Sequence, residues 1–133
     1  MKMLNHKGTV TLQTERLLLR PFSTADAQAM YDNWATDPEV TKFLTWECHR
    51  SVQDTLAFLS SLDYNKPDVY QWAIVYQGVV IGSISITEID ENARIGAFGY
   101  CIGRSFWRQG IMSEAVQALL PFLFDEVGFH RVE

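Results

Sequence analysis

The stretch over residues 94–127 constrains the fold of this chain more than any other part of it. Residues 95–102 are small, apolar or aromatic, and their side chains alternate between two sides as they do in a buried β-strand. Gly103 ends this run, and a polar, basic loop follows as far as Gly110. From Ile111 onward the apolar residues recur at helical spacing. The sequence therefore predicts a strand, a glycine-bearing loop and a helix in direct succession.

The junction of this loop with the helix predicts a binding site for an anion. The first turn of a helix presents unpaired backbone N–H groups, and the aligned peptide dipoles add partial positive charge there, which suits phosphate. Gly110 lets the backbone approach a ligand closely, Arg104 and Arg108 add positive charge, and Ser113 can add a hydroxyl donor. An ordinary strand-to-helix turn with a glycine for geometry has the same pattern, and spacing alone does not separate the two interpretations.

Composition limits the classes of protein to consider. The chain has 133 residues, of which 47% are hydrophobic, so we expect one domain with a full core. A net charge of -5 argues against nucleic acid as a partner and suits a cationic or amine substrate. Cys48 and Cys101 lie far apart and outside any metal-binding spacing, which predicts neither a disulfide nor a metal site. With no apolar run of membrane-spanning length and no signal-peptide core, we expect a cytoplasmic protein that does not bind a membrane.

The N-terminal half predicts one strand and then two helices. Residues 12–22 read as a single strand that ends near a proline. Ser23 and Ser51 each stand three positions before an aspartate, which is the spacing of a helix-capping pair, so a helix is expected after each serine. The first helix should reach about Trp34. Asp37, which precedes a proline, predicts a short helical turn between the two.

The rest of the chain predicts most of a sheet. Residues 69–76, 79–88 and 94–102 are expected to form consecutive antiparallel strands joined by tight turns. Residues 129–133 should begin a further strand after the helix. We therefore predict an α+β fold over residues 1–133, with a central, mostly antiparallel sheet flanked by helices.

Several features of residues 99–115 occur together in one known family. They are a strand ending in Gly-aromatic-x-Ile-Gly, an aromatic-Trp pair, a Gln before the loop glycine and a helix start of Ser-Glu-Ala. In this sequence they are Gly99, Tyr100, Ile102, Gly103, Phe106, Trp107, Gln109, Gly110, Ser113, Glu114 and Ala115. This combination resembles the acetyl-CoA-binding motif of the GNAT acetyltransferase superfamily, in its branch of ribosomal-protein N-terminal acetyltransferases. The order of predicted elements extends the resemblance to essentially the whole chain, although Met112 stands where the family prefers Gly or Ala.

The resemblance implies an enzyme that moves an acetyl group from acetyl-CoA to a primary amine by direct attack, without a metal. The acceptor could be a protein N-terminus, a polyamine or another small-molecule amine. Backbone groups from Tyr100 to Ile102 would orient the thioester, and for this reason Tyr100 is also predicted to be catalytic. The residues that would bind the cofactor are Tyr100, Cys101, Ile102, Arg104, Arg108, Gln109, Gly110, Ile111, Met112 and Ser113.

The acid-base and acceptor residues are less well defined by the resemblance. Related enzymes often carry an acidic residue at the position of Ala97, so Glu88, at the end of the preceding strand, is the predicted catalytic base, acting directly or through a water, with Asp90 as a second candidate. Trp46 and His49 are predicted to line the acceptor site. Each of these also has a structural interpretation, as a solvated turn carboxylate, a core tryptophan or a loop histidine. For Cys101 we expect packing rather than an acyl-carrying role.

The resemblance also raises a question at the C-terminal end. Members of this family continue with a further strand, a helix and a last strand, whereas this sequence ends at Glu133. In the family the motif strand and the next strand splay apart, and the pantetheine arm pairs with the backbone edge between them. We therefore expect a second copy of the chain to cover that open edge, or a marginally stable domain.

Three other functions are weighed against the acetyltransferase. The first is a shortened, catalytically silent module that binds CoA or another protein, which Ala97 and Met112 favour. A phosphate-loop hydrolase is disfavoured because no GxxxxGK motif occurs. A dinucleotide-binding Rossmann unit is disfavoured because the strands before the loop are linked by hairpins rather than by helices.

Overall fold

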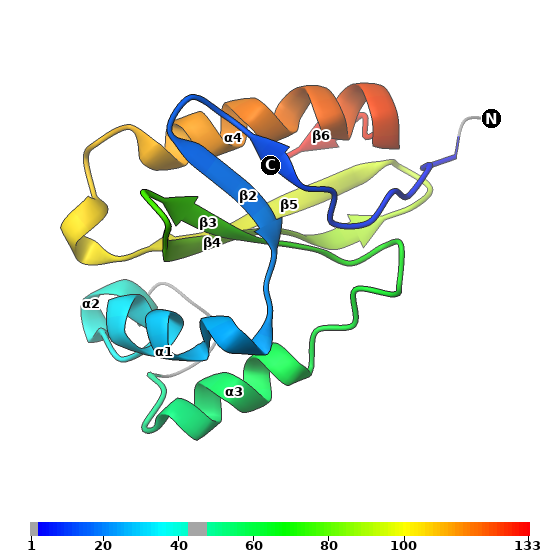
Figure 1. Cartoon of the computed structure of the whole chain (residues 1–133). Coiled ribbons are helices and arrows are strands. Elements are labelled where there is room, and N and C mark those ends of the chain that lie inside the picture. The colour runs from blue at the N-terminus through cyan, green and yellow to red at the C-terminus, as the bar shows by residue number, and fades with distance from the viewer. Residues whose placement is uncertain (1–2, 43–47) are drawn as a thin grey trace.

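The computed structural model describes residues 3–42 and 48–133, which form a curled mixed sheet with helices on both faces (Figure 1). Within this part of the chain the sheet has six strands, and their order in the sheet follows their order in the sequence. They are β1 (Leu12–Gln13), β2 (Leu17–Pro21), β3 (Tyr70–Tyr76), β4 (Val79–Asp90), β5 (Ile95–Ile102) and β6 (Arg131–Val132). All neighbours are antiparallel except β5 and β6, which run parallel. This arrangement confirms the predicted α+β fold.

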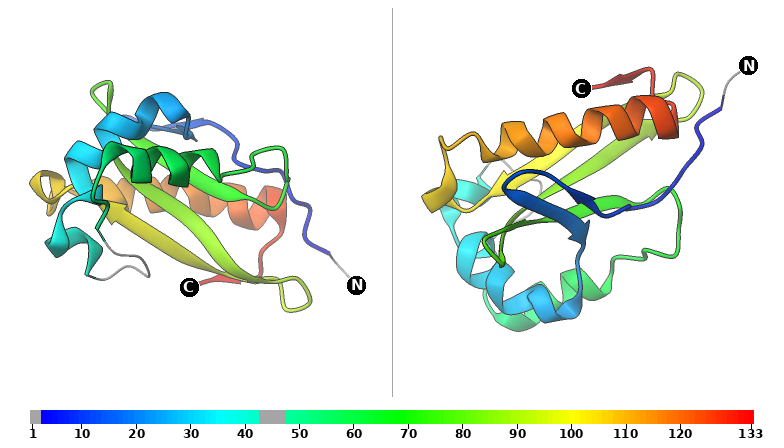
Figure 2. Two further views of the ribbon diagram at one scale, coloured as in Figure 1. Left: turned by 90° about the horizontal axis from the view of Figure 1, so that it is seen from below. Right: turned by 45° about the horizontal axis from the view of Figure 1, so that its top comes forward.

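The helices divide between the two faces of the sheet. Helices α1 (Ala27–Met30), α2 (Pro38–Thr41) and α3 (Val52–Ser60) lie on one side, and α4 (Ile111–Pro121) lies on the other (Figures 1 and 2). A 3₁₀ turn precedes α1, and π-helical turns follow α1 (Tyr31–Ala35) and α4 (Phe122–Val127). None of the helices in the described part of the chain is long and apolar enough to span a membrane.

Two hydrophobic cores hold these layers together. The core between the sheet and α4 includes Leu17, Leu19, Trp72, Ile74, Ile84, Ala115, Leu119 and Leu123. The core on the opposite face includes Met30, Trp34, Val40, Leu59, Ala73 and Val80. The apolar residues that recur at helical spacing from Ile111 onward therefore face the sheet.

The capping pairs begin the helices as predicted. The Ser23 backbone N–H donates to the Asp26 carboxylate at 2.8 Å, and the Arg20 guanidinium pairs with the same carboxylate. The Ser51 hydroxyl accepts from the Asp54 N–H at 3.4 Å. The bonds from the Ser23 and Asp54 N–H groups satisfy backbone donors that the start of a helix leaves without a partner. The first helical stretch runs through the π turn to Ala35, one residue beyond the predicted end.

The turn between β3 and β4 is the predicted two-residue hairpin. Gln77 and Gly78 have φ angles of 51° and 78°, as a type I′ turn requires. Strands β3, β4 and β5 pair successively and antiparallel, which confirms the three predicted strands. The predicted strand after α4 is also present, as β6.

The single strand expected over residues 12–22 is wrong. The chain reverses after Gln13, so that β1 and β2 pair with each other. The Thr14 N–H donates to Leu17 O, and the Leu17 N–H donates to the Thr14 hydroxyl, which closes the turn. Glu114 of α4 holds the same turn by accepting from the Thr14 hydroxyl and from Arg16.

The expectation that β5 is fully buried is also wrong. Its side chains alternate between the two faces as predicted, but Tyr100 is 57% exposed. On one side, β5 pairs with β4 along almost the whole length of β5. On the other side, β5 pairs with β6 only at Ile95 and Gly96. The second half of β5 is therefore an open edge in the described part of the chain.

Candidate functional site

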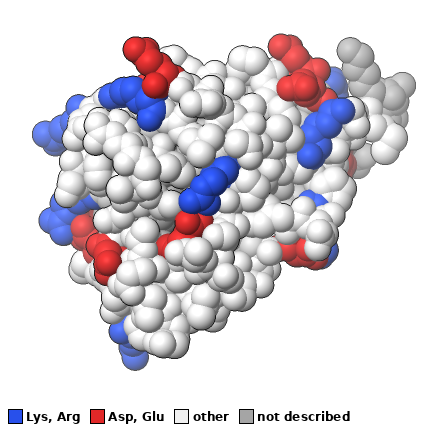
Figure 3. All heavy atoms as spheres, in the orientation of Figure 1, with Lys and Arg blue, Asp and Glu red and all other residues white. Residues whose placement is uncertain are grey.

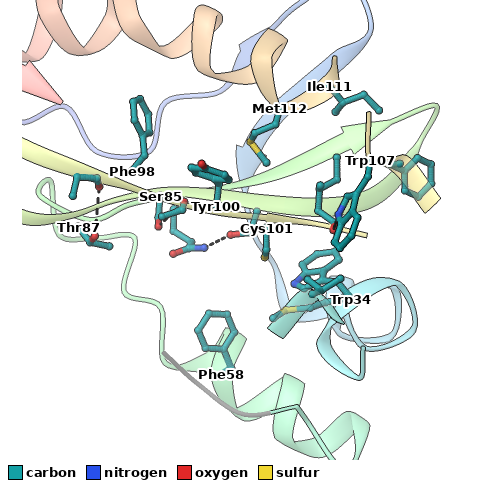
Figure 4. Close-up of a pocket in the computed structure, with 18 of the residues that line it drawn as sticks. Trp34, Phe58, Ser85, Thr87, Phe98, Tyr100, Cys101, Trp107, Ile111 and Met112 are labelled. Carbon is teal, nitrogen blue, oxygen red and sulfur yellow. Dashed lines mark hydrogen bonds between the residues drawn. The ribbon is translucent and has the colours of Figure 1, made fainter. Parts of the chain in front are cut away.

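A cavity of about 960 Å³ surrounds the open half of β5 and reaches both faces of the sheet (Figure 4). Residues after β5 and at the start of α4 form what we call the loop end of the cavity: Trp107, Arg108, Ile111 and Met112. Side chains of β3 and β4 form a polar floor, called here the hydroxyl row: Gln71, Ser83, Ser85 and Thr87. Met30, Trp34, Val40 and Phe58 make an apolar wall opposite that floor.

The loop end has the geometry of an anion site. Gly110 precedes α4 with a φ angle of 74°, a left-handed conformation that suits glycine. The first bond of the helix runs from Glu114 N to Gly110 O, so the N–H groups of residues 111–113 have no carbonyl within α4 to bond. Arg108 is exposed beside them and lines the cavity. Backbone donors, helix dipole and a guanidinium thus converge on one place.

The other polar residues predicted for this site have partners within the protein. Arg104 makes two hydrogen bonds to the Asp37 carboxylate, at 2.7 and 2.9 Å, so the structure gives it a different partner from the predicted phosphate. This guanidinium holds the pKa of Asp37 below its usual value. The Gln109 side chain donates to Ser105 O, and the exposed Ser113 hydroxyl accepts from the Gln117 amide at 3.5 Å.

Glu114 serves the fold at the start of α4. It accepts from the Arg16 Nε at 2.7 Å and from the Arg16 N–H at 3.0 Å, besides the Thr14 hydroxyl. The hydrogen bonds from Thr14 and Arg16 lower the pKa of this carboxyl to about 2. Glu114 is therefore ionised and engaged by the β1–β2 turn.

The open edge of β5 presents backbone groups to the cavity. Arg94 O, Gly96 O and Phe98 N are bonded to residues 130–133, so by the two-residue alternation of a strand Tyr100 and Ile102 turn their backbone groups to the same side. No described strand lies beside β5 past Phe98. The Trp107 indole N–H donates to Ile102 O at 2.9 Å.

The hydroxyl row offers hydrogen-bond acceptors to the cavity. The Ser85 and Thr87 hydroxyls donate their protons to Gly99 O and Ala97 O, which leaves their lone pairs free. The Gln71 amide N–H₂ donates to the Ser83 hydroxyl, which leaves its carbonyl oxygen as an acceptor. This row was not predicted from the sequence, although polar residues at every second position of an apolar strand were a visible signal.

Glu88 stands at the far end of this row. It lies at a bulge of β4 with a φ angle of 50°, is exposed, and lines the cavity. Among the described lining residues it is the one carboxylate, as Arg108 is the one guanidinium. Ile84 pairs with Tyr100, and Glu88 follows Ile84 by four residues on β4, so Glu88 is separated from Tyr100 by roughly 13 Å along the strand.

The remaining predicted residues have different positions. His49 is absent from the described lining of the cavity, because its ring bonds the Thr55 hydroxyl at 2.6 Å and packs behind Phe58. Burial lowers the pKa of His49. Trp46 lies outside the described residues. Cys101 lines the cavity, and burial raises the pKa of its thiol to about 12, so it is not a thiolate nucleophile. No described cluster of His, Cys, Asp or Glu is placed to hold a metal ion.

Comparison with known proteins places this geometry in one family. Residues 16–133 match the acetyltransferase (GNAT) domain. The N-acetyltransferase p20 of Bacillus licheniformis, whose function is uncharacterized, is 32% identical over 128 residues, which are 92% of this chain and 71% of p20.

Solved structures agree with the fold. An acetyltransferase (GNAT family) from Bacillus anthracis superposes with a TM-score of 0.79 at 23% identity, covering 92% of this chain and 71% of its own. The Microcin C7 self-immunity acetyltransferase MccE, crystallised with acetyl-CoA and AMP, superposes with a TM-score of 0.72 at 19% identity, covering 87% and 66%. The chain described here therefore belongs to the GNAT acetyltransferase family.

Proposed function

We propose that this chain transfers an acetyl group from acetyl-CoA to a primary amine, which is either a protein N-terminus or a small-molecule amine. One observation carries the proposal: a single cavity joins an anion site at the start of α4, an open strand edge and a floor of hydrogen-bond acceptors. Acetyl-CoA supplies the acetyl group as a thioester; the C–S bond breaks as the amide C–N bond forms, and CoA leaves as the free thiol. The related MccE is crystallised with acetyl-CoA, which supports this choice of cofactor.

The residues at the loop end fit CoA. The free N–H groups of residues 111–113 and the guanidinium of Arg108 suit a pyrophosphate. The backbone of Phe98, Tyr100 and Ile102 suits an extended arm that carries amides, since such an arm can pair with an open edge as a strand does. The Tyr100 N–H lies on this edge, where a donor can stabilise negative charge on a carbonyl oxygen.

The hydroxyl row supports an amine as the acceptor. Its lone pairs, the Gln71 carbonyl and the Glu88 carboxylate all accept hydrogen bonds, which matches the N–H groups of an amine. The one basic residue of the described lining, Arg108, stands at the opposite end. The floor thus favours, as the substrate that receives the acetyl group, an amine with several N–H donors.

Glu88 is the proton acceptor in this proposal. A protonated amine has no lone pair to attack with, so its proton must leave first. The distance of roughly 13 Å between Glu88 and Tyr100 along the strand requires bridging water rather than direct contact. The neutral thiol of Cys101 supports direct transfer to the amine without an acyl-cysteine.

The test is release of free thiol that depends on both acetyl-CoA and an amine. We expect Glu88→Gln to lower kcat by about 10²-fold near neutral pH, the typical contribution of a general base, with KM for acetyl-CoA within about twofold. Glu91→Gln, at the exposed turn after β4, is the matched control and should leave kcat within about twofold. Saturable CoA binding without turnover on a broad amine panel would instead support the catalytically silent module.

A further inference from the structure

The last carbonyl on the open edge of β5 is occupied by a side chain of the loop that follows. Trp107 donates its indole N–H to Ile102 O at 2.9 Å, and Trp107 remains 38% exposed and lines the cavity (Figure 4). Among the described residues, no other side chain donates a hydrogen bond to the open backbone groups of Phe98, Tyr100 and Ile102. The bond uses one of the two lone pairs of Ile102 O, so a ligand N–H reaches this carbonyl only in competition with the indole.

The loop places the indole against the strand through a tight turn. Phe106 N donates to Gly103 O and Trp107 N donates to Arg104 O, so the chain folds back directly after β5. The Arg104–Asp37 ion pair ties this turn to α2. The hydrogen bonds of this turn and its ion pair to α2 therefore hold the indole in position.

Within the described part of the chain, one residue on the open edge of β5 keeps both its backbone N–H and its C=O unbonded. On this side of the strand the groups past the last bond to β6 are Phe98 O, Tyr100 N and O, and Ile102 N and O. With Ile102 O already bonded to the indole, Tyr100 is the one residue on this part of the described edge whose N–H and C=O are both unbonded.

We propose that Trp107 is a positioning residue that restricts the amide-bearing arm of CoA to a single register on β5, the one centred on Tyr100. This inference rests on the proposed function. Without the indole N–H, Ile102 would offer both of its backbone groups, and an arm could also pair one ladder step further toward the loop. Both registers would bind CoA, but only one would be productive.

This proposal predicts an unusual kinetic signature for Trp107→Phe. A second, nonproductive register lowers kcat and KM for acetyl-CoA by the same factor and leaves kcat/KM unchanged, because unproductive complexes form at the expense of productive ones. If the freed carbonyl contributes one hydrogen bond of about 1 kcal/mol, both constants should fall about fivefold. Calorimetry should show CoA binding about fivefold tighter, with the affinity for adenosine 3′,5′-bisphosphate, which lacks the arm, within about twofold of wild type.

Trp72→Phe is the matched control. Trp72 also donates its indole N–H to a carbonyl, Val10 O at 2.8 Å, but it is fully buried and outside the described lining of the cavity. This variant should lower Tm and leave the affinities for both ligands within about twofold. Replacement of Trp107 by benzothienylalanine, which has a ring of similar shape with sulfur in place of the N–H, should reproduce the signature without a change in packing.

Three results would overturn the inference. A rise in KM, or a fall in kcat/KM beyond about threefold together with weaker binding of the bisphosphate, would show that Trp107 only supports the loop. Unchanged constants in an active enzyme would show that the register is set elsewhere. A wild-type chain that neither binds acetyl-CoA nor releases thiol would overturn the proposed function, and the inference with it.

Discussion

Arg104 and Arg108 lie in the same loop, and the structure gives them different surroundings. Arg104 makes its ion pair with Asp37 on α2, whereas Arg108 is exposed beside the free N–H groups of α4 and lines the cavity. The sequence suggested the same role for both, because Asp37 lies 67 positions away from Arg104 and no local pattern links the two. Which cation is available to a ligand is therefore decided by tertiary contacts.

We expect Arg108→Ala to weaken CoA binding by about tenfold, since one hydrogen bond between charged groups is lost at an exposed site. Arg104→Ala is the matched control and should change the affinity by less than about twofold, because its guanidinium is bonded to Asp37. Calorimetric titration of both variants with CoA measures the difference. Equal losses would mean that Arg104 leaves Asp37 when CoA binds.

The hydroxyl row shows the same limit of sequence reasoning. Ser83, Ser85 and Thr87 were readable as a polar stripe, but their value as acceptors depends on hydrogen bonds to β5 and β3. Only the paired strands show which hydroxyl protons are already engaged. The sequence of one strand shows the polar stripe, but only the paired strands show which of its groups can accept a hydrogen bond.

At the scale of whole elements, local signals were sufficient where the neighbouring residues determine the structure. The capping pairs at Ser23 and Ser51 and the Gln77–Gly78 turn are complete within four residues, and each was predicted correctly. The β1–β2 turn was missed because it contains no Gly or Pro and is held by Glu114, which is 100 positions from Thr14. A long-range contact replaces the usual turn residues here.

Glu114 should make part of the stability of the fold depend on pH. Its pKa is lowered from 4.5 to about 2 in the folded chain, so the ionised form stabilises the native state. This contribution is fully present above about pH 4.5 and is lost as the pH falls toward 2. We expect Glu114→Gln to lower Tm at pH 6 and to make the loss of Tm between pH 4.5 and 2 smaller than in wild type.

Circular dichroism melts across this pH range provide the measurement. Glu15→Gln is the control, because Glu15 is an exposed carboxylate in the same turn. Asp26 also has a lowered pKa through its bond to Arg20. Wild type and both variants therefore share a loss of stability in acid that comes from Asp26. Parallel Tm curves for wild type and Glu114→Gln would show that the link between α4 and the β1–β2 turn contributes no pH-dependent stability.

At the scale of the molecule, the open half of β5 has two candidate occupants. A second copy of the chain is expected from the sequence to cover it, and in the proposed function the arm of CoA pairs with it. On the face seen in Figure 3, which carries β1 and β2, acidic and basic side chains are scattered around a broad uncharged area, and the open half of β5 lies on the opposite side of the sheet. Both occupants would use the backbone of Phe98, Tyr100 and Ile102, and they should therefore exclude each other.

Mutual exclusion has a thermodynamic consequence that can be measured. If dimer and CoA compete for the β5 edge, CoA must shift the chain toward monomer, and by reciprocity dimerisation must weaken CoA binding. We expect the sedimentation coefficient to fall on saturation with CoA, and the apparent Kd for CoA to rise as the protein concentration is raised. A dimer strengthened by CoA would place the interface away from β5, since a shared edge cannot be stabilised by its competitor. A chain that remains monomeric at every concentration and melts well above ambient temperature would show that the open edge needs no partner chain, and the expected oligomer would be wrong.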